Sequence, residues 1–165
     1  MLEIVTYPAP ILRRQAEPVD RFDDELSEII EEMIDIMYAD DGVGLAAPQV
    51  NISKQLLVLD DRQGNGPMAV INPEIVWKSD EKEKMEEGCL SLPDIHVDVT
   101  RPISIHVRCQ NAKGEELTIQ AEGYFARILQ HEMDHLNGVL LIDHASPIQR
   151  QLVKSKLRKL EKSYV

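Results

Sequence analysis

The sequence is short of the features that mark nucleic-acid-binding, membrane and exported proteins. Its 18 lysines and arginines are outnumbered by 29 aspartates and glutamates, which gives a net charge of -11, whereas phosphate binding draws on surplus basic residues. No apolar run approaches the length of a membrane span, and the opening MLEIVTYPAP has the layout of neither a signal peptide nor a transit peptide. We therefore expect a cytoplasmic protein that does not contact a membrane and whose primary ligand is not nucleic acid.

Cysteine is also scarce, since Cys89 and Cys109 are the only two. This favours a reducing compartment, where a thiol serves as a ligand, a nucleophile or a core residue, over a disulfide. A length of 165 residues with 43% hydrophobic content suits one domain with its own core and is too small for two. We predict a single domain over residues 1–165.

What the sequence does contain is a succession of periodic segments. Helical spacing of apolar residues predicts amphipathic helices over residues 24–38 and 123–137, with Gly138 placed to end the second. A capping-box pattern at residues 146–149 predicts a third helix to about Lys162. Period-two alternation predicts strands over residues 55–59, 69–76, 95–99, 103–109 and 117–119. This order indicates an α+β fold.

The segment QHEMDHLNG, residues 130–138, carries the strongest chemical signal. On a helix, His131 and His135 lie four residues apart and point from one face, so their ring nitrogens can bind one metal ion. Glu132 is turned away from that direction, which suits a general base acting on water better than a ligand. The alternative is a pair of histidines that only packs in the core. His96 and His106 alternate with apolar strand residues, and we expect both at the surface.

Two histidines leave a metal site short of a third protein ligand, whose identity separates the reaction classes. A metzincin protease would have a histidine in place of Leu141, and a thermolysin-like protease would need a downstream glutamate, of which only Glu161 exists, in a basic helix. Cys89 remains, in EGCLSLP, where glycine and proline suggest a sharply shaped loop and not a strand interior. A thiolate ligand fits there. The alternative for Cys89 is a small buried hydrophobe, which is what we expect of Cys109.

A third motif, GVGLAAPQ over residues 42–49, is rich in glycine and other small residues. Such a segment is typical of a backbone that passes close to a ligand, and the alternative is close packing between a helix and a sheet. A phosphate loop is not favoured, because no Gly-Lys-Ser/Thr follows and Asp40 and Asp41 precede the motif.

The last predicted helix has a basic outer face. We favour a solvated surface there over docking to an anionic partner. The basic residues are Arg150, Lys154, Lys156, Arg158, Lys159 and Lys162.

Taken together, GVGLAAPQ, EGCLSLP and QHEMDHLNG, in this order and at these separations, resemble the three signature motifs of the peptide deformylase family. The resemblance runs from TYPAPILRRQAEPV near the N-terminus through INPEI at residues 71–75, so it covers essentially the whole chain. The fold we expect is α+β, with antiparallel β-sheets packed around a central metal-binding helix, an N-terminal amphipathic helix and a C-terminal helix.

Matched residue by residue, the resemblance implies roles for six residues. The metal ligands would be Cys89, His131 and His135. The acid/base would be Glu132, and Gln49 with the backbone N–H of Leu90 would surround the oxyanion. The implied reaction is hydrolysis of the formyl group of N-terminal formyl-methionine on nascent polypeptides, releasing formate after attack by metal-bound hydroxide. The family points to Fe(II), although the ligand set also suits Zn, Ni or Co.

The substrate peptide is expected to lie extended beside two short segments and to bind them through main-chain hydrogen bonds. These segments are Val43-Gly44 and Glu87-Gly88. A pocket formed by Val43, Leu90, Ile128 and the stem of Arg127 would receive the methionine side chain. Many relatives have an aliphatic residue in place of Arg127. Two rival functions remain: a zinc endopeptidase that uses the same helix, and a non-catalytic metal-binding domain. A further partner would be ribosomal RNA, which the basic last helix could contact.

Overall fold

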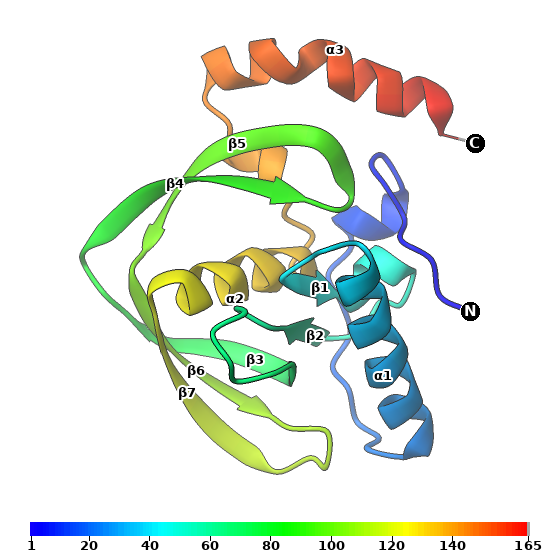
Figure 1. Ribbon diagram of the computed structural model, residues 1–165, viewed down its shortest axis with the longest axis vertical. Coiled ribbons are helices and arrows are strands. Elements are labelled where there is room, and N and C mark those ends of the chain that lie inside the picture. The colour runs from blue at the N-terminus through cyan, green and yellow to red at the C-terminus, as the bar shows by residue number, and fades with distance from the viewer. Residues whose placement is uncertain (165) are drawn as a thin grey trace.

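The chain folds into two β-sheets and three α-helices in a computed structural model that describes residues 1–164 (Figure 1). The α-helices are α1 (Asp24–Ala39), α2 (Gly123–Leu136) and α3 (Pro147–Ser163). The strands are β1 (Gly44–Ala46), β2 (Leu56–Leu59), β3 (Met68–Lys78), β4 (Lys82–Cys89), β5 (Leu92–Pro102), β6 (Ser104–Gln110) and β7 (Glu116–Glu122). Three short 3-10 helices are η1 (Pro10–Arg13), η2 (Ala47–Val50) and η3 (Leu141–His144).

Both sheets are antiparallel. The larger sheet has the order β1-β2-β3-β6-β7, whereas β4 pairs with β5 alone. β3 changes its pairing at Asn72, a residue with φ of 52°, after which it continues against β6 but no longer against β2. The Asn72 side chain fixes this bend, because it accepts a hydrogen bond from the Val19 N–H and donates one to the Val19 carbonyl.

Helix α2 runs between the two-stranded sheet and the larger sheet, as predicted for the central helix (Figure 1). One side of the helix places Leu129 and Met133 in a core with Leu57 and Val107 of the larger sheet. Residues of the opposite side face β4 and β5 and carry polar groups. The helix therefore brings polar residues into the interior of the molecule, among them the candidate site residues His131, Glu132 and His135.

A glycine ends α2 where no other residue fits. Gly138 has φ of 73°, and a Cβ atom there would lie 2.5 Å from the carbonyl oxygen of Arg13. Its N–H donates to the carbonyl of His135, and that of Val139 donates to Asp134, which satisfies free carbonyls of the last turn. The close approach of the N-terminal segment fixes the end of the QHEMDHLNG motif.

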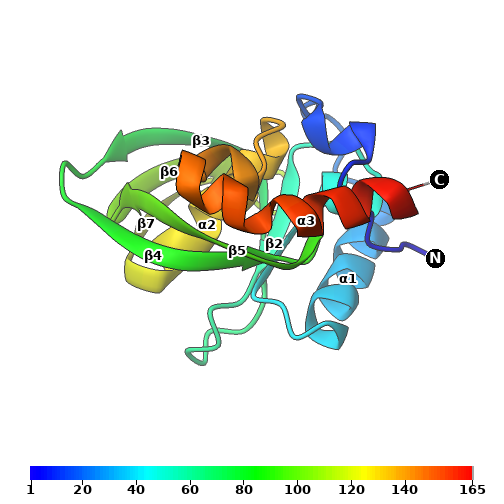
Figure 2. The ribbon, with the colours of Figure 1, turned by 90° about the horizontal axis from the view of Figure 1, so that it is seen from above.

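Helix α3 lies across β5 on the side away from α2 (Figure 2). Its N-terminus has the predicted capping box, in which Ser146 Oγ accepts from the Gln149 N–H. Val153 and Leu157 are buried in a core with Val97 of β5. Among the helices of residues 1–164, none is long and apolar enough to cross a membrane.

The predicted helices and five predicted strands are confirmed, with ends shifted by a few residues. Strand β4 was not predicted, because KEKMEE has no apolar alternation and pairs with β5 through its backbone. The prediction that Cys89 lies in a loop is wrong. Cys89 is the last residue of β4, at a register shift, and the sharp turn follows it at Leu90 and Ser91.

Candidate active site

Three potential metal ligands converge where β4 ends against α2. His131 and His135 come from one face of α2, and their rings are 5.3 Å apart at the centroids. Cys89 approaches from the end of β4, with its Sγ 3.2 Å from Nε2 of His135. One ligand atom from each of the three residues lies within 4.8 Å of the others. The structure thus brings together the three residues that the sequence singled out for a metal.

The charges in this group favour a thiolate. Burial alone would raise the pKa of Cys89, but His135 and His131 lower it to about 5. Burial opposes protonation of His131, yet the charge of Glu132 and hydrogen bonds with Cys89 and Glu87 raise its pKa well above the usual value. When metal binding releases the ring protons, a thiolate beside two neutral imidazoles is a donor set that binds borderline divalent metals.

A buried carboxylate holds His131 in position. Glu87 Oε1 lies 2.9 Å from His131 Nδ1, which leaves Nε2 of that ring directed toward the ligand cluster. Although burial raises the pKa of Glu87, hydrogen bonds from Arg101 and His131 hold it well below its ordinary value. Arg101 donates to both Glu87 oxygens, at 2.7 Å and 2.9 Å.

Arg127 completes this network. It lines the cavity, and its guanidinium donates to Glu87 Oε2 at 2.6 Å. The same group donates to the backbone carbonyls of Val99 and Glu83, and so ties α2 to β5 and β4. Sequence reasoning placed only the Glu87 main chain in the site, and therefore missed its side chain, which is 8% exposed.

Glu132 lies next to the ligand cluster and has an unused oxygen. It is 4% exposed, and its Oε2 is 4.0 Å from His131 Nε2. Oε1 has no hydrogen-bond partner; His135 Nδ1 is the other such buried side-chain atom among residues 1–164. Burial raises the pKa of Glu132 despite the nearby histidines. A carboxylate with a raised pKa and a free oxygen suits proton transfer.

Gly44 permits this placement of Glu132. A Cβ atom at Gly44 would lie 2.6 Å from Glu132 Oε2 and 2.8 Å from its Cγ. The glycine of the GVGLAAPQ motif therefore leaves room for the carboxylate, in addition to any role in binding a ligand.

Gln49 reaches the same site from η2. Its Oε1 accepts from the Ala46 N–H at 2.9 Å, which directs Nε2 toward Cys89 Sγ, 3.6 Å away. Nε2 also donates to Ser91 Oγ at 3.2 Å, and Ser91 in turn donates to the Val5 carbonyl. Ser91 is fully buried and was not predicted. The one feature of the sequence that could have identified Ser91 is its position two residues after Cys89.

A cavity of about 570 Å³ opens over the cluster. It is lined by most of the predicted site residues, namely Val43, Gly44, Gln49, Glu87, Gly88, Cys89, Leu90, Arg127, Ile128, His131 and Glu132. The lining also contains Asp41, Met85, Glu86, Asp94, His96 and Tyr124, none of which was predicted there. His96 is exposed, as expected, whereas His106 is half-buried against Trp77, with ring centroids 4.5 Å apart.

The protease ligand sets find no support in the structure. Glu161 Oε1 accepts a hydrogen bond from the Tyr7 hydroxyl, and Glu161 does not line the cavity. Leu141 is buried in a hydrophobic core.

Comparisons with known proteins agree with this geometry. Residues 1–151 match the model of the polypeptide deformylase family. A peptide deformylase of Thermotoga petrophila is 55% identical over 157 residues, which are 95% of this chain and 94% of the relative. A peptide deformylase of Phenylobacterium zucineum is 43% identical over 164 residues, which are 98% of this chain and 97% of the relative.

Solved structures give the same result. A crystal structure of peptide deformylase from Plasmodium falciparum superposes with a TM-score of 0.94 at 43% identity, covering 98% of this chain and 96% of that one. The crystal structure of peptide deformylase from Thermotoga maritima superposes with a TM-score of 0.85 at 54% identity. The alignment covers 89% of this chain and 99% of that one.

Proposed function

This chain belongs to the peptide deformylase family and hydrolyses the formyl group from the N-terminal formyl-methionine of nascent polypeptides, and we propose that it does so with one metal ion beside Glu132. The proposed ligands are Cys89, His131 and His135. The observation that carries the proposal is the convergence of these three donors next to a buried carboxylate whose Oε1 is free.

The residues fit such an ion. Glu87 occupies Nδ1 of His131 and leaves Nε2 for the metal, and the low pKa of Cys89 makes its thiolate available at neutral pH. A divalent ion held there supplies a Lewis acid and lowers the pKa of water toward about 7. We propose Fe(II), while Zn, Ni and Co remain compatible with a thiolate and two imidazoles.

Glu132 would move the proton in both halves of the reaction. Its ionised carboxylate accepts a proton from the attacking water as the formyl carbon is attacked. The protonated carboxyl then donates this proton to the departing amide nitrogen, which otherwise leaves poorly. The raised pKa of Glu132 brings the carboxyl closer to neutral pH, which suits both steps.

Gln49 and Leu90 would stabilise the negative charge that develops on the formyl oxygen. Gln49 Nε2 is held beside Cys89 by its contacts with Ala46 and Ser91, and the Leu90 N–H follows Cys89 directly in the chain. One preorganised donor of this kind typically contributes about 3 kcal/mol to the transition state.

The peptide would lie extended between two free strand edges. β1 ends the order of the larger sheet, and β4 pairs only with β5, so each can offer backbone groups to a substrate. Val43-Gly44 and Glu87-Gly88 line the cavity at these edges. The methionine side chain would contact Val43, Leu90 and Ile128, together with the stem of Arg127.

The first test is formate release from a formyl-methionyl tripeptide by protein purified without oxygen. Formate from the parent and at least about 10²-fold less from Glu132→Gln would support Glu132 as the acid/base. Retention of most activity in this variant would refute the role of Glu132.

The choice of Fe(II) predicts oxygen-sensitive activity, because ferrous iron beside a thiolate is open to oxidation. Iron-containing protein should lose activity in air, whereas protein loaded with Ni should keep it. Equal stability of the two preparations in air would contradict this choice.

We further propose that the whole chain is one catalytic domain in the cytoplasm and that the basic face of α3 is a solvated surface, with ribosomal RNA as the alternative partner to be tested. Lys154, Arg158 and Lys159 are exposed on the side of α3 that does not pack on β5. Weaker ribosome co-sedimentation after reversal of these three charges, without lower turnover of a short peptide, would favour the alternative.

A further inference from the structure

Residues 42–44 form part of the lining of the active-site cavity, and a second layer of residues holds them in place. Asp60, which follows β2, donates its N–H to the Val43 carbonyl at 2.9 Å. Arg62 donates from Nη2 to the Gly42 carbonyl at 3.0 Å. Neither Asp60 nor Arg62 lines the cavity, so both act on this part of the lining without touching a ligand inside it.

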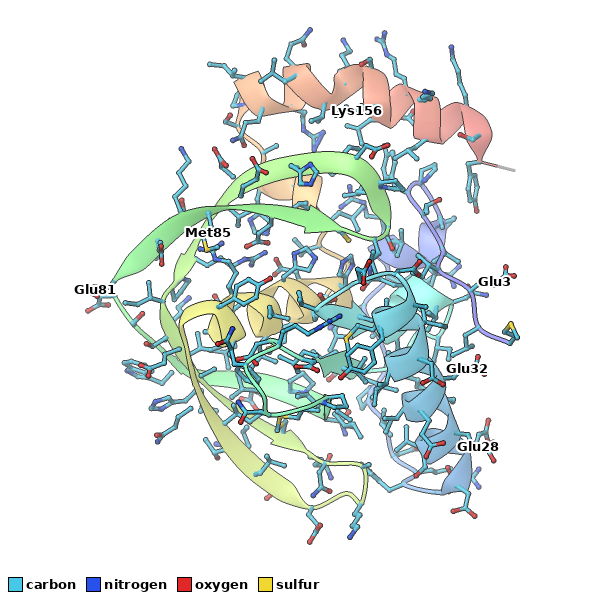
Figure 3. The ribbon with its side chains drawn as sticks, viewed as in Figure 1. Glu3, Glu28, Glu32, Glu81, Met85 and Lys156 are labelled. Atoms are coloured by element: carbon cyan, nitrogen blue, oxygen red, sulfur yellow. The ribbon has the colours of Figure 1, made fainter. Side chains whose placement is uncertain are left out.

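Arg62 is itself held by Tyr38 and Asp60. The guanidinium carbon of Arg62 lies 5.0 Å from the centroid of the Tyr38 ring, within the range of a cation–π contact. The Tyr38 hydroxyl donates to Asp60 Oδ2, and Asp60 Oδ1 accepts from the Arg62 N–H at 2.8 Å. We call Tyr38, Asp60 and Arg62 the Arg62 clasp, because they join α1 to the connection between β2 and β3. Figure 3 labels Glu28 and Glu32 on α1, and the helix continues from them toward α2, so its last turn, with Tyr38, lies beside β1.

The connection between β2 and β3 has few other anchors. Residues 62–67 are exposed, and Arg62, Gly64 and Gly66 have left-handed φ values of 63°, 94° and 74°. Within residues 1–164, the side chains of residues 63–67 form no hydrogen bond or ion pair. A left-handed φ is uncommon for a residue with a long side chain, and the contacts with Gly42 and Tyr38 stabilise it at Arg62. Arg62 therefore links this exposed loop to the cavity lining.

The position of residues 42–44 decides which backbone groups face a substrate. In an antiparallel pair, the N–H and carbonyl groups of successive residues point alternately toward the partner strand and away from it. Val43 directs its carbonyl to Asp60, and the next residue, Gly44, lies opposite Leu59 of β2. The N–H and carbonyl of Gly44 therefore point to the free edge of β1, where the peptide is proposed to lie. A shift of residues 42–44 would turn these groups out of line.

We propose that Arg62 is a positioning residue for the substrate main chain, which together with Tyr38 and Asp60 fixes residues 42–44 in the orientation that binds the peptide beyond its formyl-methionine. This inference rests on the proposed function. Loss of Arg62 would leave Glu132 and the metal ligands in place, because α2 and β4 carry them and the loop does not. Weaker binding of the peptide, with the chemical step retained, is therefore the expected result.

The test compares two neutral substrates, formyl-Met-Ala-Ser amide and formyl-methionine amide, in the metal-loaded parent and in R62A. For the tripeptide, R62A should raise KM about fivefold and change kcat by less than about twofold, as expected when one main-chain hydrogen bond that contributes to binding is lost. For formyl-methionine amide, kcat/KM should change by less than about twofold. Both substrates are uncharged, so removal of the Arg62 charge does not itself alter their attraction to the site.

Gln63→Ala is the matched control, because Gln63 is the next residue of the same exposed loop and its side chain forms no hydrogen bond within residues 1–164. It should keep the KM of the parent for both substrates. Tyr38→Leu removes the ring beneath Arg62 and the hydrogen bond to Asp60, so it should also raise the KM of the tripeptide. The double variant Y38L/R62A should have nearly the KM of the weaker-binding single variant, since the two residues act as a unit.

An unchanged KM for the tripeptide in R62A would overturn the inference alone. An equal loss of kcat/KM for both substrates, or an effect confined to kcat, would also overturn it, because general damage to the site would then explain the result. Additive effects in Y38L/R62A would show that the clasp does not act as a unit, and if Y38L does not fold, Y38F replaces it. Failure of the parent to release formate from either substrate would instead overturn the proposed function.

Discussion

Replacing Glu87 with glutamine should destabilise the protein strongly, because one buried carboxylate serves three positive or donating groups. Oε1 receives Arg101 and His131, and Oε2 receives Arg101 and Arg127. Whichever of the two oxygens is replaced by the amide nitrogen in Glu87→Gln, two donors lose their acceptor and face an N–H group instead. Arg101 would keep only Asp134 as a charged partner, at 3.0 Å.

The expected magnitude follows from burial. Removing one partner of a buried ion pair typically costs about 3–5 kcal/mol, which lowers the unfolding temperature of a chain of this size by roughly 10 °C. The assay is thermal unfolding followed by circular dichroism, in chelator, so that loss of metal does not contribute. Glu86→Gln is the matched control, since Glu86 is the adjacent residue and is exposed without an ion-pair partner; its unfolding temperature should change by less than about 2 °C.

The pH dependence gives a second test. The pKa of Glu87 is lowered in the folded state, so its ionisation contributes stability above its unfolded pKa of about 4.3, and this contribution is lost as the pH falls. The difference in stability between the parent and Glu87→Gln should therefore shrink below about pH 4. An unfolding temperature of Glu87→Gln within about 1 °C of the parent at pH 7 would refute the reasoning.

Two further predictions concern Gly44 and Cys109. Gly44→Ala should lower kcat by about 10²-fold, because the added Cβ would displace Glu132. The double variant G44A/E132Q should have nearly the same kcat as E132Q alone. Additive losses of activity would show that the effect of Gly44→Ala does not act through Glu132. Burial raises the pKa of the Cys109 thiol to about 11. The unfolded thiol ionises first, so stability should fall as the pH rises from about 9 to 11, and Cys109→Val should show a smaller fall in urea titrations; equal slopes would contradict this.

The sequence was sufficient for the features that depend on local spacing. His131 and His135 share a face because they are four residues apart on a helix, and the period of residues 95–99 and 103–109 identified strands with one buried face. The link to Cys89, 42 positions before His131, came from elimination and family resemblance, because spacing along a chain does not show which loop approaches a helix.

The features that could not be predicted from the sequence depend on tertiary contacts. β4 is charged along most of its length and is held by pairing with β5, so no property of its own residues marks it as a strand. The Glu87–Arg101–Arg127 cluster joins β4, β5 and α2, and each residue alone resembles a solvated surface charge. Ser91 became identifiable only when the fold placed its hydroxyl against the side chain of Gln49.

The position of Cys89 on one sheet and of both histidines on the helix below it has a consequence for assembly. An ion bound by all three would join two segments whose nearest ligands are 42 positions apart, and so would act as a reversible cross-link closing a long loop. A thiolate and two imidazole rings would then do, through the bound ion, what a disulfide does in secreted proteins. Loading of the metal and final docking of the β4–β5 hairpin onto α2 become linked equilibria, in which each promotes the other.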